Sequence, residues 1–271
     1  MSYKDIIYSV EGSIAVITIN RPDVLNALTL DTHAELAQAV VEADRDDNIR
    51  VMVITGAGKG FCSGQDVQDS FGGGEGSRDV EAMRGREAKL GFLQGKRPYP
   101  GGIPLLTVNT PSIAAVNGAA VGVGCDLALM CDMRIASDKA KFGELFVRVG
   151  IIPDEALLVL PRLVGLGKTY ELMLTADVID ANEAERIGLV NRTVPHEELM
   201  NATMELATKI AEKAPIAVRL AKEGIRRSIN MQVEEIMQWQ AMAQAFCLES
   251  GDHQEGIQAF IEKREPQFKG K

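Results

Sequence analysis

The chain has 271 residues, of which 46% are hydrophobic and 25% are charged, and its formal net charge is −9. That length accommodates one large domain or two small ones, while the excess of acidic groups argues against a surface that binds nucleic acid through phosphate contacts. No stretch is apolar over the length needed to span a bilayer, so we expect a soluble protein whose partners include neither a membrane nor a nucleic acid.

Cysteine usage indicates a reducing compartment. The cysteines follow no paired spacing, and each lies in or beside an apolar run (Cys62, Cys125, Cys131 and Cys247). Reduced and mostly buried thiols are typical of cytosolic proteins. The first residues also lack the apolar stretch of a signal peptide, so we expect a cytoplasmic location.

The N-terminal part alternates strands with a helix. Two β-branched runs, residues 6–10 and 14–19, flank a turn at 11–13 and predict a hairpin. Residues 30–43 carry apolar side chains at helical spacing, and residues 51–55 form a short apolar run that predicts a strand. The order strand, helix, strand predicts a right-handed crossover.

Residues 68–104 differ in kind, because glycine and proline gather there around one expected helix at 80–93. We interpret this segment as an insertion over the functional site and not as a linker between domains. Regular patterns resume with a strand at 113–116, a helix at 125–130 and a strand at 133–136.

The remainder of the chain is almost entirely helix-forming. Four helices are expected, over residues 197–213, 216–228, 233–248 and 254–263. The sequence therefore predicts an α/β core of strand-helix units over residues 1–195, followed by a helical segment over residues 196–271.

Two glycine-rich turns each follow a buried strand, one at residues 56–66 and one at 117–126. Glycine at the entrance to a helix lets backbone N–H groups face a ligand with no side chain in between, and the helix N-terminus adds partial positive charge. Either turn alone is better explained by close packing of the chain. Two such turns favour a paired site.

Nucleotide and metal sites find little support. The first turn lacks the glycine spacing of a dinucleotide fingerprint, and Arg162 stands where a phosphate loop ending at residues 167–169 would need glycine. His33, His196 and His253 lack metal-ligand spacing and are expected on exposed helix surfaces. No nucleophile elbow is present in a suitable context. The sequence predicts neither a metal site nor serine hydrolase chemistry.

Several motifs together resemble the crotonase superfamily, the enoyl-CoA hydratase/isomerase family, in their order and spacing. Besides the first glycine-rich turn at 56–66, they are residues 19–28, 114–132, which include the second turn, 140–143, 150–153, 160–165 and 255–264. The resemblance covers nearly the whole chain. It implies a crotonase-like repeated ββα (spiral) core with a helical C-terminal segment, and an acyl-CoA substrate. Coenzyme A is then part of the substrate, and no separate cofactor is implied.

The resemblance assigns an oxyanion hole to two backbone N–H groups, those of Gln65 and Val123. Loss of a proton beside a thioester leaves charge on the carbonyl oxygen, and each preorganised donor to such an oxygen contributes about 3 to 4 kcal/mol. Relatives usually have a small residue at the second position. Because the donor is a backbone group, Val123 satisfies the pattern if its side chain points away.

Contacts to coenzyme A are also carried over from the resemblance. The matching positions of the N-terminal part are Val24, Leu25, Ser63, Asp66 and Val67. Phe260 and Lys263 match tail positions that reach the coenzyme in relatives, commonly across a subunit boundary, and Lys263 could meet a phosphate as a point charge. A solvated helix lysine is the alternative for Lys263. The tail also implies a homotrimer or a dimer of trimers.

The acidic residues distinguish the reactions of the family. Hydratases carry two glutamates; Asp126 aligns with the first, and Phe146 takes the place of the second. Asp154 stands where hydratases commonly have glycine, but where dienoyl-CoA isomerases and an aryl-CoA dehalogenase have a catalytic aspartate. The pair Asp126 and Asp154 thus resembles a double-bond isomerase. Phe146 would keep the substrate pocket dry and raise the pKa of a neighbouring carboxyl group.

Capping offers a structural alternative for both aspartates. Asp126 opens a helix and could complement its dipole, and Asp154 precedes a helix-like run that it could cap. Glu144 and Glu155 are further acids nearby.

We therefore expect an enzyme that transfers protons on an enoyl-CoA or related acyl-CoA, with Asp154 and Asp126 as acid and base and a lean toward double-bond isomerisation. Hydration is the first alternative, and thioester hydrolysis, ring opening or decarboxylation on the same scaffold is the second. A non-catalytic scaffold or RNA-binding relative is a remote third.

Overall fold

The computed structural model describes residues 3–68 and 102–271. The insertion expected at 68–104, with its helix at 80–93, lies outside the described residues except at its two ends.

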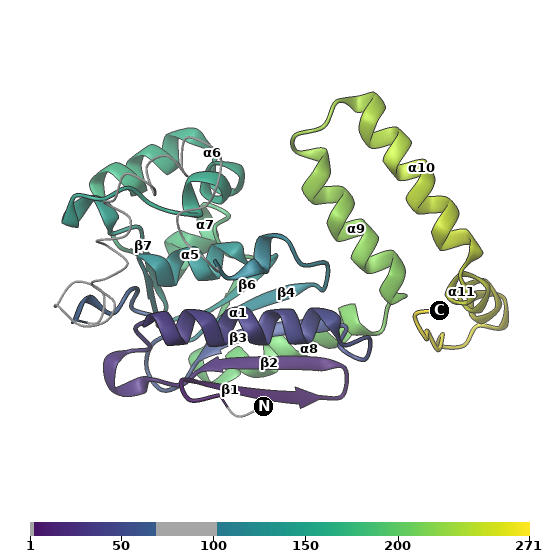
Figure 1. Cartoon of the computed structure of the whole chain (residues 1–271), viewed down its shortest axis with the longest axis horizontal. Helices are drawn as coiled ribbons and strands as arrows, with labels where there is room; N and C mark the ends of the chain where they lie inside the picture. Colours follow the sequence, from purple (N-terminus) through teal and green to yellow (C-terminus); the bar gives the residue numbers. More distant parts are fainter. Residues whose placement is uncertain (1–2, 69–101) are drawn as a thin grey trace.

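Six strands form the main sheet (Figure 1). In spatial order they are β1 (Ile6–Glu11), β2 (Ile14–Ile19), β3 (Val51–Gly56), β4 (Ser112–Val116), β6 (Met133–Ser137) and β9 (Arg192–Val194). The first two strands form the predicted antiparallel hairpin, and all later neighbours are parallel. The connection from β2 to β3 runs through the predicted helix, α1 (Leu30–Arg45).

Strand β3 shows why the sheet is buried on both faces. All six of its residues are buried, and alternate side chains enter different cores. Met52 and Ile54 join the larger cluster, which includes α1, whereas Val51 and Val53 join a smaller cluster with α8 (Leu199–Ala211). Because side chains alternate across a strand, a strand covered on both faces needs a continuous apolar run. That run is what made β3 recognisable in the sequence.

A second sheet of three short strands gives the core its repeated pattern. It contains β5 (Ala119–Val121), β7 (Lys141–Gly143) and β8 (Ile179–Asp180). Along the chain, β4 and β5 precede α5 (Val123–Met130), and β6 and β7 precede α6 (Ala156–Thr175). One strand of each pair lies in the main sheet and the other in the small sheet. The predicted α/β class with a repeated ββα core is confirmed.

Sequence patterns failed to predict α6 as a full helix. It contains Pro161, and Gly165 interrupts it with a non-helical conformation (φ 76°). Both residues normally end a helical pattern, so the sequence predicted only a helix-like apolar run after Asp154, without the bounds of a helix. The short α7 (Ala181–Arg186) and the three strands of the second sheet were also missed, because elements of a few residues carry little periodicity.

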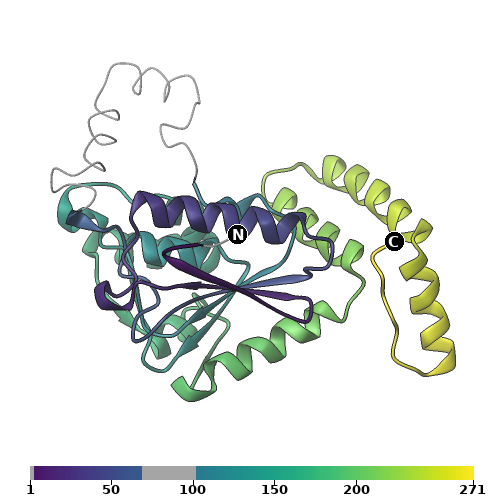
Figure 2. The ribbon, with the colours of Figure 1, turned by 60° about the horizontal axis from the view of Figure 1, so that its bottom comes forward.

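The C-terminal helices divide into one that covers the sheet and three that leave it. α8 packs on the main sheet, whereas α9 (Pro215–Ser228), α10 (Val233–Glu249) and α11 (Gly251–Glu262) form an arm beside the core (Figures 1 and 2). The predicted helical C-terminal segment is confirmed, and the domain boundary at 195/196 stays a prediction. None of the helices in the described ranges is long and apolar enough to cross a membrane.

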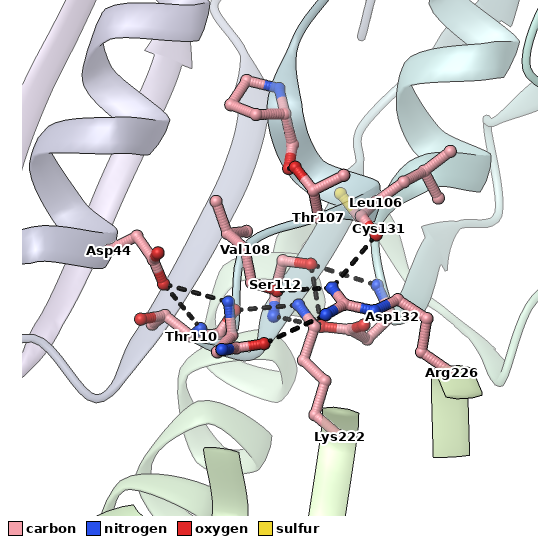
Figure 3. A network of polar contacts seen from close by, with 12 residues as sticks. Asp44, Leu106, Thr107, Val108, Thr110, Ser112, Cys131, Asp132, Lys222 and Arg226 are labelled. Carbon is pink, nitrogen blue, oxygen red and sulfur yellow. Dashed lines mark hydrogen bonds and ion pairs between the residues drawn. The ribbon is translucent and has the colours of Figure 1, made fainter. Parts of the chain in front are cut away.

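A polar network joins the arm to the core (Figure 3). Nζ of Lys222, on α9, lies 2.7 Å from a carboxylate oxygen of Asp132 and donates to the backbone carbonyl of Thr110 at 2.9 Å. The same oxygen of Asp132 accepts hydrogen bonds from the backbone N–H and the hydroxyl of Ser112. One carboxylate therefore ties the arm to β4 and to the end of α5.

Arg226 adds a second attachment one turn further along α9. Its guanidinium donates to the backbone carbonyls of Leu106 and Val108 at 3.1 and 3.4 Å. On the other side of this loop, Asp44 of α1 accepts from the backbone N–H of Thr110 at 2.8 Å. Loop 104–111 is thus held between α1 and the arm.

We predict that Lys222→Met destabilises the folded chain by about 1 kcal/mol, because it leaves the Asp132 carboxylate, whose side chain is 30% exposed, without its cation. The free energy of unfolding in urea measures this. Lys209→Met is the matched control, because the Lys209–Glu205 pair is exposed on α8 and should contribute less than about 0.5 kcal/mol. Equal losses in the two variants would contradict the assignment of a structural role to the Lys222 joint.

Candidate active site

The two glycine-rich turns lie against one another. Both Phe61 and Cys62 donate their N–H groups to the carbonyl of Ala119, at 3.1 and 2.9 Å, and Val121 donates to the carbonyl of Cys62 at 3.1 Å. These bonds run like those of two neighbouring strands. The pairing of the turns, which the sequence only suggested, is therefore a feature of the fold.

Glycine is required where the turns touch. A Cβ atom at Gly64, whose φ is +96°, would lie 2.9 Å from the carbonyl oxygen of Val121. At Gly124 it would lie only 2.1 Å from the carbonyl oxygen of Cys62. Any side chain at these two positions would push the turns apart.

The amides of Gln65 and Val123 come from the parts of the turns that meet. Leu28 donates to the carbonyl of Gly64, and Asp66 donates to that of Leu28, both at 2.8 Å. In such a parallel bridge the N–H of the central residue, Gln65, faces away from Leu28. Val123 begins α5, so its N–H belongs to the group that a helix start leaves without an intrahelical acceptor. An added Cβ at Gly64 would lie 3.7 Å from that nitrogen.

Two asparagines hold the first turn in place. Nδ2 of Asn26 and Nδ2 of Asn117 both donate to the carbonyl of Gly60, at 2.8 and 3.0 Å. Asn26 also donates to Ala57, and Asn117 to Gly58. Both asparagines lie inside motifs recognised in the sequence, but this role was not predicted for them. An asparagine next to a glycine-rich turn was the available signal, since its side chain readily bonds to nearby backbone.

His33 was wrongly expected on an exposed surface and is a further residue that sequence reasoning missed. It lies in the first turn of α1, half-buried, with Nε2 at 2.9 Å from Oε1 of Gln65, so the imidazole donates to the side chain of that residue. Burial lowers the pKa of His33. The neutral ring thus couples the start of α1 to the turn that carries the Gln65 amide.

The predicted acids are brought together. Asp126 is fully buried in α5, and its Oδ1 accepts from the backbone N–H of Ala156 at 2.6 Å. Asp126, Asp154 and Glu155 each place a carboxylate oxygen within 4.8 Å of the others. Asp126 therefore binds the start of α6, and the N-cap residue of α6, Glu155, makes no side-chain capping bond.

Burial and mutual repulsion favour the protonated acids. Burial first, and then the charge of Glu144, raise the pKa of Asp126 to about 9. Partial desolvation and the adjacent Glu155 also raise the pKa of Asp154, which stays exposed to solvent. With a pKa of about 9, Asp126 keeps its proton at neutral pH. Asp126 can then act as a general acid, and the more accessible Asp154 can accept a proton.

Two residues after β7 complete the acidic region. Glu144 is 2% exposed, and burial raises its pKa to about 7. Phe146 is also buried, at the start of η3 (Phe146–Val149), a 3-10 turn. That it lines the substrate pocket stays a prediction.

The coenzyme-contact residues of the N-terminal part form one surface region. Ser63 donates its N–H to the carbonyl of Leu25 and its hydroxyl to that of Val24. Asp66 pairs with the guanidinium of Arg21 at 3.2 Å. The exposed hydrophobic residues of the predicted set are Val24, Leu25 and Val67. Exposed hydrophobic and polar residues thus lie close together here, as a surface that binds a ligand requires. Their contact with coenzyme A stays a prediction.

Phe260 and Lys263 lie elsewhere. Phe260 is 86% exposed near the end of α11, and Lys263 follows that helix in a left-handed conformation. Figure 1 shows α11 at the outer end of the arm, well apart from α5 in the core. Within one chain these two residues do not reach the acids, so a contact with the coenzyme would have to come from another subunit.

Comparison with known proteins finds matches over almost the entire chain. A family model described as enoyl-CoA hydratase/isomerase matches residues 9–271. A short-chain-enoyl-CoA hydratase of Clostridium acetobutylicum is 40% identical over 266 residues, or 97% of each chain. A 1,2-epoxyphenylacetyl-CoA isomerase of Escherichia coli is 34% identical over 267 residues, or 98% of each chain.

A solved structure shows the same architecture. The crystal structure of an enoyl-CoA hydratase from Bacillus anthracis superimposes with a TM-score of 0.87 at 34% identity, over 99% of this chain and 100% of that one.

We predict that Asp126→Asn makes the stability of the chain less dependent on pH. The folded-state pKa of Asp126, about 9, lies above the unfolded value of about 3.9. The folded state therefore binds more protons between these values, and stability falls as pH rises through that window. Asparagine keeps an acceptor for Ala156 but cannot ionise.

Relative to wild type, the free energy of unfolding of Asp126→Asn should rise by about 1 kcal/mol per pH unit between about pH 5 and about pH 8. Urea denaturation at a series of pH values measures the difference. Parallel pH dependences of the two proteins would show that Asp126 is ionised in the folded state.

Proposed function

Because the chain belongs to the enoyl-CoA hydratase/isomerase family and is an enzyme of that family, we propose that it moves a double bond in an enoyl-CoA or related acyl-CoA. The observation that carries this proposal is the acid arrangement. Asp126 and Asp154 have carboxylate oxygens within 4.8 Å of one another, while Phe146 occupies the position of the second hydratase glutamate. Isomerisation needs positioned acids and no activated water.

The oxyanion hole would be formed by the N–H groups of Gln65 and Val123. In support, the Gly64 backbone packs against the start of α5, since a Cβ atom added at Gly64 would lie 3.7 Å from the nitrogen of Val123. A thioester oxygen held between two such donors gains stabilisation as it becomes an enolate oxygen. The helix dipole of α5 adds to this, because its positive end lies at Val123.

The proposed reaction removes a proton from one carbon of the acyl chain and adds a proton to another. Asp154 takes the proton from the carbon next to the thioester carbonyl, and the electron pair moves onto the carbonyl oxygen. Asp126, which holds a proton, gives it to the far carbon of the enolate system, and the double bond shifts by one position. A proton then passes from Asp154 to Asp126 across the short gap between them, which restores both groups.

Hydration is the second candidate. The C. acetobutylicum relative carries the name of a hydratase, and Asp126 aligns with the first acid of the hydratases. The isomerase candidate has its own support in the name of the E. coli relative. The two reactions share the enolate and differ in whether water adds to carbon, so product analysis separates them.

We further propose that the active form is a homotrimer or a dimer of trimers. Phe260 is 86% exposed on α11, which lies well apart from α5, the helix of Asp126 (Figure 1). Contact between the tail and coenzyme A bound to another subunit would explain why family-like residues occur there. Lys263, also on the tail, would supply a cation to a coenzyme phosphate.

We predict that Asp154→Asn lowers the isomerisation of 3-enoyl-CoA by about 100-fold or more, because the proposed base is lost. Conversion of 3-enoyl-CoA to 2-enoyl-CoA is followed by mass spectrometry and chromatography, with crotonyl-CoA hydration measured in parallel. The exposed Asp177 offers a matched control, and Asp177→Asn should retain activity. Strong hydration of crotonyl-CoA that survives Asp154→Asn would favour a hydratase instead.

We predict that Gly64→Ala lowers kcat by about 100-fold, because its Cβ would lie 2.9 Å from the carbonyl oxygen of Val121 and part the two turns. Gly167→Ala is the control, because an added Cβ there meets nothing within 4 Å. Both variants are assayed on the same acyl-CoA after circular dichroism has shown that they fold. Full activity in Gly64→Ala would remove the amides of Gln65 and Val123 from the mechanism.

A further inference from the structure

Glu144 is a buried carboxylic acid to which the proposed mechanism gives no task. Its side chain is 2% exposed, and among the described residues neither carboxylate oxygen accepts an N–H or O–H hydrogen bond, so the weak thiol donor of Cys125 is its polar neighbour there. Burying a carboxylate with so little compensation costs several kcal/mol if it is ionised. A group retained at that cost calls for an explanation.

The backbone places Glu144 beside the first turn of α5. Gly143, the last residue of β7, pairs with Val121, and Gly122 donates its N–H to the carbonyl of Gly143 at 2.8 Å. The next residue along the chain is Glu144. Together with Cys125 of α5 it lines a small cavity, whose other walls are mostly apolar.

The groups around Glu144 provide no compensating cation. From α5 they are the thiol of Cys125 and the carboxyl of Asp126, and at the start of α6 the carboxyl of Asp154. Asp177, after α6, lies on the cavity wall. Among the described residues, every charged side chain that acts on Asp126 is itself a carboxylate.

We propose that Glu144 is a positioning residue of the proposed active site, whose carboxylate keeps Asp126 in the protonated, proton-donating form. Two carboxyl groups that share a low-dielectric site cannot both ionise easily, so one of them holds a proton. Glu144 is buried, whereas Asp154 is exposed to solvent. The buried charge of Glu144 then favours a proton on Asp126, while the accessible Asp154 can accept one.

The contact of Asp126 with α6 is consistent with a protonated Asp126. Its Oδ1 is engaged by the N–H of Ala156, whereas Oδ2 has no partner among the described residues. Oδ2 is thus the oxygen available to carry the proton. The catalytic role of that proton rests on the proposed function, but the coupling of the two carboxyl groups does not.

The test is a pH titration of the infrared carbonyl stretch of protonated carboxyl groups, which requires no substrate. The band that Asp126→Asn removes identifies Asp126, and in wild type it should persist to about pH 9. In Glu144→Gln the same band should disappear about one pH unit lower, because the neighbouring charge is gone. Glu144→Leu is a second neutral variant and should give the same shift. It serves as the test if Glu144→Gln folds poorly.

Asp177→Asn is the matched control, since this residue lines the same cavity but is exposed, and the band should not move. A band that titrates in both neutral Glu144 variants at the wild-type pH would overturn the proposal. If the shift is found, the alkaline limb of the isomerisation rate should move in the same direction. A shifted band in a protein that does not isomerise enoyl-CoA would instead reject the proposed function and leave the coupling of Glu144 to Asp126 intact.

Discussion

The carbonyl of Gly60 receives two side-chain amides, from Asn26 and Asn117, and the rest of the site depends on this meeting point. Asn26 lies in the segment before α1, and Asn117 follows β4. Three segments far apart in the sequence are thereby fixed at one oxygen atom. Because the asparagines are largely or fully buried, loss of either would leave polar groups without partners. The first turn can then hold its position against α5.

The acidic region reverses the usual preference of folded proteins for paired charges. Asp126 in α5 and Glu144 directly after β7 are both buried, and no cation acts on either of them among the described residues. Buried carboxyl groups without a cation lower the stability of the fold as pH rises and they ionise. They are therefore expected at functional sites, where a shifted pKa is useful. The same burial that weakens the fold gives a carboxylic acid that still holds a proton at neutral pH. Stability and reactivity are opposed at these residues.

Local patterns in the sequence predicted most of the fold, and contacts between distant segments explain what they missed. The continuous apolar run of β3 and the helical spacing of α1 were sufficient, because both report burial directly. The resemblance to a family located the turns and Asp154. The contact of His33 with Gln65 and the isolation of Glu144 could not be predicted, since each depends on which side chains the folded chain brings near.

The arm is fastened to the core largely through backbone carbonyls. Arg226 binds those of Leu106 and Val108, Lys222 binds that of Thr110, and Arg219 binds that of Ile49. A carbonyl oxygen is present whatever residue carries it. The hydrogen bonds of this attachment therefore do not depend on which side chains the loop carries, and substitutions there are constrained by the burial of residues such as Leu105 and Val108 and not by the joint to the arm.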